Sequence, residues 1–126
     1  MLEEEQKAEL NSLHKMEKKF RLKKNYQFNY VYKHGKSVTG ELCTLVYCKN
    51  NGTSPRIGIS VSKKIGKAVK RNKLKRRLRE IVGLIILDLN PGYNYIFLPK
   101  TPASDSSFVQ LKQSVEKLIT KAAVWR

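Results

Sequence analysis

Residues 56–79 read RIGISVSKKIGKAVKRNKLKRRLR, and this stretch decides the fold. Ile57, Ile59 and Val61 alternate with small or polar residues, which is the pattern of a strand with one buried face. A basic loop follows over residues 63–67. Residues 68–88 then carry apolar side chains at the 3.6-residue spacing of a helix that buries one face. These side chains are Leu74, Leu78, Ile81, Val82, Ile85 and Leu89.

Upstream of this stretch, the sequence predicts a helix and a strand. Asn25 is a favoured helix-capping residue and Gly35 a favoured terminator, so we expect a first helix between them. Residues 37–49 have the composition of a strand, with a break expected at Gly40. The polar run over residues 50–55 predicts the turn that precedes Ile57.

Downstream, Asn90, Pro91 and Gly92 end the long helix. A short strand is expected over residues 93–98, and a last helix over residues 104–123. The order of elements is therefore αβββαβα, which predicts an α+β fold, a two-layer sandwich of helices on a small sheet.

The chain of 126 residues is long enough for one domain with one core. Residues 1–15 are acidic in character and precede the first compact apolar pattern, so we interpret them as an extension and residues 16–126 as a single domain. The sequence has no secretion signal and no run of 18 apolar residues. We therefore expect a cytoplasmic protein without a membrane partner.

Charge points to a polyanionic partner. The chain has 26 basic and 10 acidic residues, a formal charge of +16. Eleven Lys or Arg and one acid lie between Arg56 and Glu80. Solvated helices usually mix the two signs to gain i, i+4 pairs, whereas this helix repels itself. Nucleic acid is the leading interpretation, and a merely well-solvated basic face is the alternative.

Four aromatic residues follow a basic arm over residues 15–24, and they favour RNA. A basic groove with aromatic platforms is typical of proteins that hold single-stranded nucleic acid. The four are Tyr26, Phe28, Tyr30 and Tyr32. Phe28 and Tyr32 could equally form the core face of the first helix, and spacing alone does not decide between the two roles.

The sequence contains no recognisable catalytic centre. It has two histidines, scattered acids and no P-loop or dinucleotide fingerprint, so we expect no catalytic residue and no metal site on this chain. Cys43 and Cys48 lie five residues apart in a predicted strand, on opposite faces and roughly 16 Å apart. They cannot pair in a regular strand, and we expect small, half-buried thiols.

Together these residues resemble the bacterial ribonuclease P protein subunit. The hallmark is an Arg-Asn-x-x-Lys-Arg-x-x-Arg helix after a Ser-Lys-Lys loop, present here as Arg71 to Arg79 after Ser62 to Lys64. Upstream, residues 20–28 and 32–35 also resemble the start of the family domain, and the likeness covers about residues 17–122. Since family members usually begin near the basic arm, we expect translation to start at Met16, with residues 1–15 an annotation artefact.

The resemblance implies a subunit that joins a catalytic RNA in removing the 5′ leader from precursor tRNA. That RNA would bind the Mg²⁺ ions and perform the hydrolysis, and the protein would need no cofactor or small-molecule substrate. The residues implied to contact RNA are Lys63, Lys64, Lys67, Arg71, Asn72, Lys75, Arg76 and Arg79. Those implied to line a leader cleft between the first helix and the sheet are Lys24, Phe28, Tyr32, Thr44 and Val46.

The resemblance also implies a ribosomal-protein-like fold with a left-handed βαβ crossover, the opposite of the usual hand. Val46 stands where some relatives carry a cleft tyrosine, which puts one stacking contact in doubt. Three other functions fit the basic composition: a ribosomal or RNA-chaperone protein, a nucleoid-type DNA binder and a self-sufficient nuclease.

Overall fold

The computed structural model describes residues 17–126 of the chain, and the expectations for residues 1–15 and Met16 lie outside this range. The four strands form one sheet in the order β1-β2-β4-β3. The main elements are α2 (Asn25–His34), β1 (Lys36–Thr39), β2 (Cys43–Lys49), β3 (Arg56–Ile59), α3 (Ala68–Ile85), β4 (Tyr93–Pro99) and α4 (Phe108–Ala122). The αβββαβα order and the mixed α+β class are therefore confirmed.

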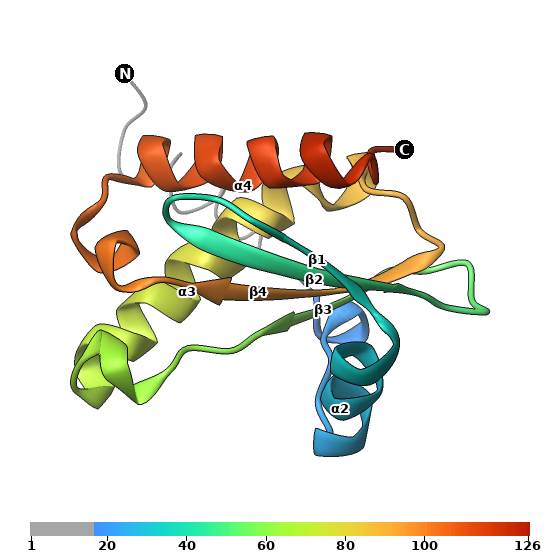
Figure 1. Ribbon diagram of the computed structural model, residues 1–126, viewed down its shortest axis with the longest axis horizontal. Coiled ribbons are helices and arrows are strands. Elements are labelled where there is room, and N and C mark those ends of the chain that lie inside the picture. Colours follow the sequence, from blue (N-terminus) through green and yellow to red (C-terminus); the bar gives the residue numbers. More distant parts are fainter. Residues whose placement is uncertain (1–16) are drawn as a thin grey trace.

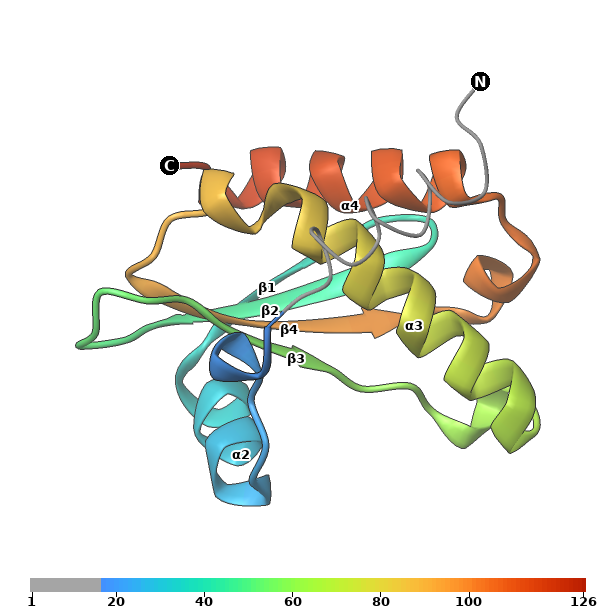
Figure 2. The same ribbon diagram turned by 180° about the vertical axis from the view of Figure 1, so that it is seen from behind.

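Helices cover both faces of the sheet. Figures 1 and 2 show α3 and α4 on one face and α2 on the other. The larger core lies between the sheet and α3 and α4, and includes Leu45, Tyr95 and Phe97 from the strands. A smaller cluster lies under α2, where Val31 packs with Ile96. Apolar residues on both faces of β4 explain its central place in the sheet.

The helix α2 has the predicted limits but a different cap. Its N-cap is Lys24, and the Gln27 side-chain oxygen accepts hydrogen bonds from the backbone of Lys23 and Lys24 at 3.0 and 3.1 Å. Gly35 ends the helix. A Cβ atom on Gly35 would lie 2.5 Å from the carbonyl oxygen of Val31, so a side chain would not fit there.

The strand predicted over residues 37–49 is a hairpin of β1 and β2, divided near Gly40 as expected. The next strand, β3, ends at Ile59 and is shorter than predicted. It runs parallel to its neighbour β4, and α3 connects the two. This β3–α3–β4 unit is the crossover for which the family resemblance implies a left hand.

The two long helices differ from prediction at their ends. The α-helical part of α3 stops at Ile85 and continues as a short 3-10 helix over Ile86–Asp88. The predicted last helix is divided into a 3-10 turn, Thr101–Asp105, and α4. Ser107 separates them because its side chain caps α4. No helix in residues 17–126 combines the length and the apolar character needed to cross a membrane.

The two cysteines lie on opposite faces of the sheet, as predicted. Cys43 belongs to the larger core and Cys48 to the cluster under α2, and both thiols are free. Burial raises the pKa of the Cys43 thiol to about 12. The thiol therefore stays protonated and serves as a small apolar group.

Candidate nucleic-acid interface

A short 3-10 helix, η2 (Lys63–Ile65), sets the basic loop in place. Ser62 caps it by accepting a hydrogen bond from the backbone of Lys64 at 3.2 Å, and the buried Ile65 anchors it to the core. Gly66 has φ of +146°, a conformation that favours glycine. Held in this way, Lys63 and Lys64 are exposed to solvent, as is Lys67, which leads into α3.

The basic residues of α3 lie beside its buried stripe, as the helical spacing predicted. Leu74 and Leu78 are buried, Asn72 and Arg76 are exposed, and Lys75 is half-buried. The predicted RNA contacts of α3 and η2 thus form one surface, called here the basic surface. It consists of Lys63, Lys64, Lys67, Arg71, Asn72, Lys75, Arg76 and Arg79.

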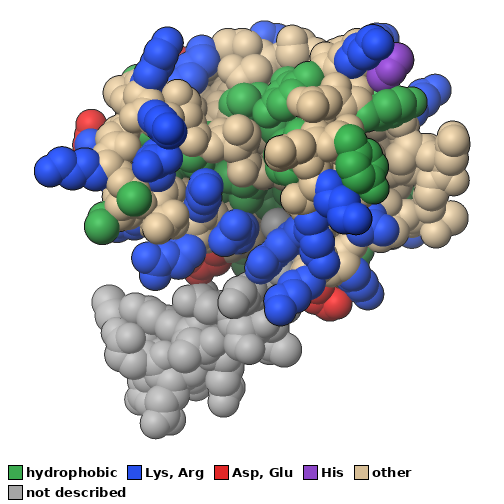
Figure 3. Space-filling model, turned by 90° about the horizontal axis from the view of Figure 1, so that it is seen from below, with side chains coloured by type: hydrophobic (Ala, Val, Ile, Leu, Met, Phe, Trp, Pro, Cys, Tyr) green, Lys and Arg blue, Asp and Glu red, His purple; other side chains and the backbone are tan. Residues whose placement is uncertain are grey.

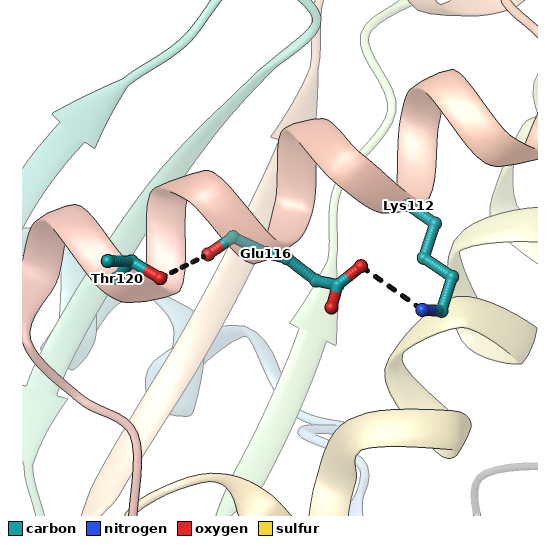
Figure 4. Close-up of polar contacts among 3 residues, drawn as sticks. All are labelled: Lys112, Glu116 and Thr120. Atoms are coloured by element: carbon teal, nitrogen blue, oxygen red, sulfur yellow. Dashed lines mark hydrogen bonds and ion pairs between the residues drawn. The ribbon is translucent and has the colours of Figure 1, made fainter.

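Within residues 17–126, no ion pair involves a side chain of α3. On α4, by contrast, Lys112 lies 3.1 Å from Glu116, whose backbone oxygen also accepts a hydrogen bond from Thr120 (Figure 4). The basic surface therefore has no internal counter-charge in the described part of the chain. Its cations are available to an external anion.

Two arginines at the edge of the basic surface lie partly inside the protein. Burial lowers the pKa of the Arg79 guanidinium, and the positive charge of Arg21 lowers it further. Arg79 still stays charged at neutral pH. Arg71 is half-buried, and its Nε has no hydrogen-bond partner within residues 17–126. The positive charges of Arg79 and Arg21, which act on each other, favour an anion at this edge.

Arg77 has a different role from its neighbour Arg76. Its guanidinium donates a hydrogen bond to the backbone oxygen of Ser106 at 2.9 Å, and so ties α3 to the segment before α4. Sequence spacing could not reveal this partner, because it lies 29 residues away.

The second predicted site lies on the face of the sheet that α2 covers. Phe28 and Val46 pack on the cluster under α2, together with Leu98 of β4. We call these three half-buried residues the sheet patch. Thr44 lies two positions before Val46 and therefore on the same face of β2. It pairs with Leu98 on the neighbouring strand.

Tyr32 and Lys24 lie at the two ends of α2, and both are exposed. Tyr32 has 42% of its surface accessible, so it is not a core residue. Lys24 places its ammonium group 6.0 Å from the centre of the Tyr26 ring. Phe28 packs on the core cluster and is still partly exposed, so its position is compatible with both roles left open by its spacing.

Two residues of this site were not predicted from the sequence. Leu98 could have been found from the unbroken apolar run Tyr95 to Leu98, which implies that β4 has two apolar faces. Gly58 lies under the ring of Phe28, where an added Cβ would be 2.5 Å from Cε1. No local signal in the sequence identifies that contact.

Basic and apolar side chains share one side of the molecule (Figure 3). In Figure 1, α2 and the start of α3 both project below the sheet, one at each end. Seen from below, the protein shows apolar side chains with Lys and Arg side chains around them and few acids (Figure 3). This arrangement fits a ligand with both bases and phosphates.

Side chains of the types that bind metals do not cluster in the part of the chain that the structure describes. No three His, Cys, Asp or Glu side chains within residues 17–126 lie close enough together to hold a metal ion. The ring of His34 contacts that of Tyr30 at a tilt of 41°, with ring centres 4.4 Å apart.

Sequence comparisons agree on one family. A family model described as Ribonuclease P matches residues 16–123. The chain is 39% identical to the ribonuclease P protein component of Thermoanaerobacter sp. (strain X514), covering 83% of this chain and 90% of that protein. It is 36% identical to the ribonuclease P protein component of Clostridium botulinum (strain 657 / Type Ba4), covering 86% and 98%.

Solved structures agree with the sequences. The RNase P protein of Staphylococcus aureus superposes with a TM-score of 0.78 at 36% identity, covering 85% of this chain and 98% of that chain. The RNase P protein of Thermotoga maritima superposes with a TM-score of 0.74 at 30% identity, covering 80% and 96%. With a matching model over most of its length and relatives of the same fold, the chain belongs to the ribonuclease P protein family.

Proposed function

We propose that this protein binds the catalytic RNA of ribonuclease P with the basic surface and the 5′ leader of precursor tRNA on the sheet patch. By holding the two RNAs together, it promotes removal of the leader and formation of the mature tRNA 5′ end. The observation that carries the proposal is that a basic helix without ion pairs in residues 17–126 and a partly exposed aromatic and apolar surface under α2 are both presented on one side of the molecule (Figure 3).

Each part supplies a different contribution. The basic surface neutralises phosphates and lowers the repulsion between two polyanions. Arginine in particular donates paired hydrogen bonds to phosphate and stacks on bases. Phe28 and Tyr32 offer ring faces to unpaired bases of the leader, and Thr44 and Val46 form the floor on β2. Lys24 adds a cation at the N-terminal end of α2.

The chemistry of cleavage belongs, on this proposal, to the RNA partner. Mg²⁺ prefers oxygen ligands in a fixed geometry, and residues 17–126 do not gather such a set. The protein contributes affinity and position, in the cytoplasm, and no cofactor of its own. A lower Mg²⁺ requirement for cleavage follows, because the protein supplies positive charge that the ions would otherwise supply.

The test is cleavage of a precursor tRNA by a cognate ribonuclease P RNA at low Mg²⁺, with and without the protein. We expect the protein to restore accurate 5′ cleavage. Arg76→Ala should weaken RNA binding and reduce the slope of log affinity against log salt by about one unit, because one phosphate contact is lost.

Arg77→Ala is the matched control, one residue along the same helix. It removes the hydrogen bond to Ser106 and should lower stability while changing the salt slope less than Arg76→Ala. Tight RNA binding without any effect on cleavage would reject the proposal, and would favour a ribosomal or RNA-chaperone function.

A further inference from the structure

A hollow lies beside α2, on the opposite flank of this helix from the sheet patch. Its volume is about 780 Å³, and it lies where β2 ends and β3 and β4 begin. Tyr26 and Tyr30 of α2 form one wall, and Arg56 and Asn94 belong to the opposite wall. None of these four residues is among those implied to contact RNA by the family resemblance.

The two flanks of α2 carry separate pairs of aromatic residues. Two residues along a helix correspond to about 200° of rotation, so positions 26 and 30 face away from positions 28 and 32. Tyr26 is 66% exposed and Tyr30 54% exposed. These two rings are therefore not needed for the core, and their faces are accessible from the hollow.

The opposite wall presents a fixed hydrogen-bond donor. The Asn50 amide is oriented by the backbone, because its oxygen accepts from Gly52 at 2.9 Å and its nitrogen donates to Ser54 at 3.3 Å. The same nitrogen donates to the side-chain oxygen of Asn94 at 3.0 Å. The Asn94 amide nitrogen is thus turned away from Asn50, and it donates no hydrogen bond within residues 17–126.

The charged groups at the hollow that belong to residues 17–126 are positive. Arg56 is exposed, Lys24 lies by the Tyr26 ring, and no Asp or Glu of this part of the chain lines the walls. Aromatic faces, an oriented amide donor and a guanidinium group match the ring, the polar edge and the phosphate of a nucleotide. The apolar Leu22 also lines the hollow and suits a flat base.

We propose that this hollow binds an unpaired nucleotide of RNA, with its base against Tyr26 and Tyr30 and its phosphate near Arg56. The proposal rests on the proposed function for the class of ligand, and adds a second binding site on the far side of α2. The nucleotide comes either from the leader, beyond the sheet patch, or from an unpaired segment of the catalytic RNA.

The test uses the full chain and a fluorescein-labelled dodecauridylate, with binding measured by anisotropy. Tyr26→Ala/Tyr30→Ala should weaken binding about 5- to 150-fold, the range expected for loss of one stacked base. Tyr26→Phe/Tyr30→Phe keeps both rings and should bind within about twofold of the wild type. Arg56→Gln should instead reduce the salt slope by about one unit.

Three RNAs then identify the source of the nucleotide. If the double alanine variant, in the holoenzyme, binds precursor tRNA more weakly but mature tRNA as tightly as the wild type, the site belongs to the leader. If instead the variant binds the catalytic RNA more weakly, with no tRNA present, the site belongs to that RNA. Wild-type affinity of the double alanine variant for the oligonucleotide and for all three RNAs overturns the proposal.

A matched variant separates this result from failure of the proposed function. Tyr32→Ala removes an exposed ring on the other flank of α2. If Tyr32→Ala weakens leader binding, and Tyr26→Ala/Tyr30→Ala binds the oligonucleotide, the leader and the catalytic RNA as tightly as the wild type, the proposed function stands and the second site is wrong. Circular dichroism confirms that each variant is folded.

Discussion

Gly58→Ala is expected to disturb the sheet patch through a single methyl group. The new Cβ would lie 2.5 Å from Cε1 and 2.8 Å from Cζ of Phe28, and 3.1 Å from Cδ1 of Leu22. Carbon atoms in contact prefer about 3.5–4.0 Å, so the ring of Phe28 must move. The backbone of Gly58 does not have positive φ, so the alanine suffers from this contact and not from its own conformation.

The expected loss of stability is about 1–3 kcal/mol, the usual cost of overpacking. Phe28→Ala should cost about 2 kcal/mol, roughly half the loss for a fully buried ring. In the double variant the ring is absent, so Gly58→Ala should be neutral or stabilising by up to about 1 kcal/mol. The double variant should therefore be more stable than the sum of the two losses predicts, by about 1–3 kcal/mol.

Urea unfolding followed by circular dichroism measures all three variants, provided that the m values agree. Gly52→Ala is the control, because the nearest atom to its added Cβ is 3.6 Å away. Equal stability of Gly58→Ala and Gly52→Ala, or strictly additive losses in the double variant, would refute the close packing of Phe28 on β3. Leader affinity should fall with Gly58→Ala if the displaced ring is the one that stacks on a base.

Two further predictions concern parts of the fold away from the RNA-binding residues. Ser107→Ala should lower the free energy of unfolding by about 1 kcal/mol, because Ser107 accepts a hydrogen bond from the backbone of Gln110 at 3.1 Å, and Ser107→Asp should retain most of it. Thermal unfolding of both variants checks this. Cys43 should make the protein less stable in alkali, since its pKa rises from 9.0 to about 12 on folding. The contribution of the protonated Cys43 thiol to the free energy of unfolding is complete below about pH 9. It is lost as the pH rises towards 12, because in this range the thiol ionises only in the unfolded chain. Cys43→Ala should therefore flatten the fall in unfolding free energy over this range, and an unchanged slope in urea titrations would contradict it.

The elements of this fold could be predicted because each has a local pattern. The spacing of Leu74, Leu78 and Ile81 identifies α3, and alternation identifies β3. The boundaries were less certain where one turn passes into another, as at Ile85, since apolar residues three positions apart can share a face in both 3-10 and α turns. The cap of α2 was missed because Gln27 acts through its side chain from inside the helix.

The candidate site was predictable only as far as one helix or one strand face reaches. The basic surface lies on consecutive turns and followed from charge and period. The contacts of Phe28 with Gly58 and of Arg77 with Ser106, and the effect of the Arg21 charge on the pKa of Arg79, join distant segments. They depend on how the sheet is ordered, and no periodicity in one sequence contains that order.

The central position of β4 has a consequence for how the protein is made. β4 lies between β2 and β3, although it is the last of the four strands in the chain. While a ribosome is still adding residues before Tyr93, β2 and β3 have no partner between them, although the seven Lys and Arg residues of α3 have already been synthesised. Pairing of such distant segments is slow and leaves apolar surface exposed in the meantime. The nascent chain should therefore carry the positive charge of α3 before the sheet is complete. We expect RNA to bind the chain at this stage, before β4 pairs with β2 and β3.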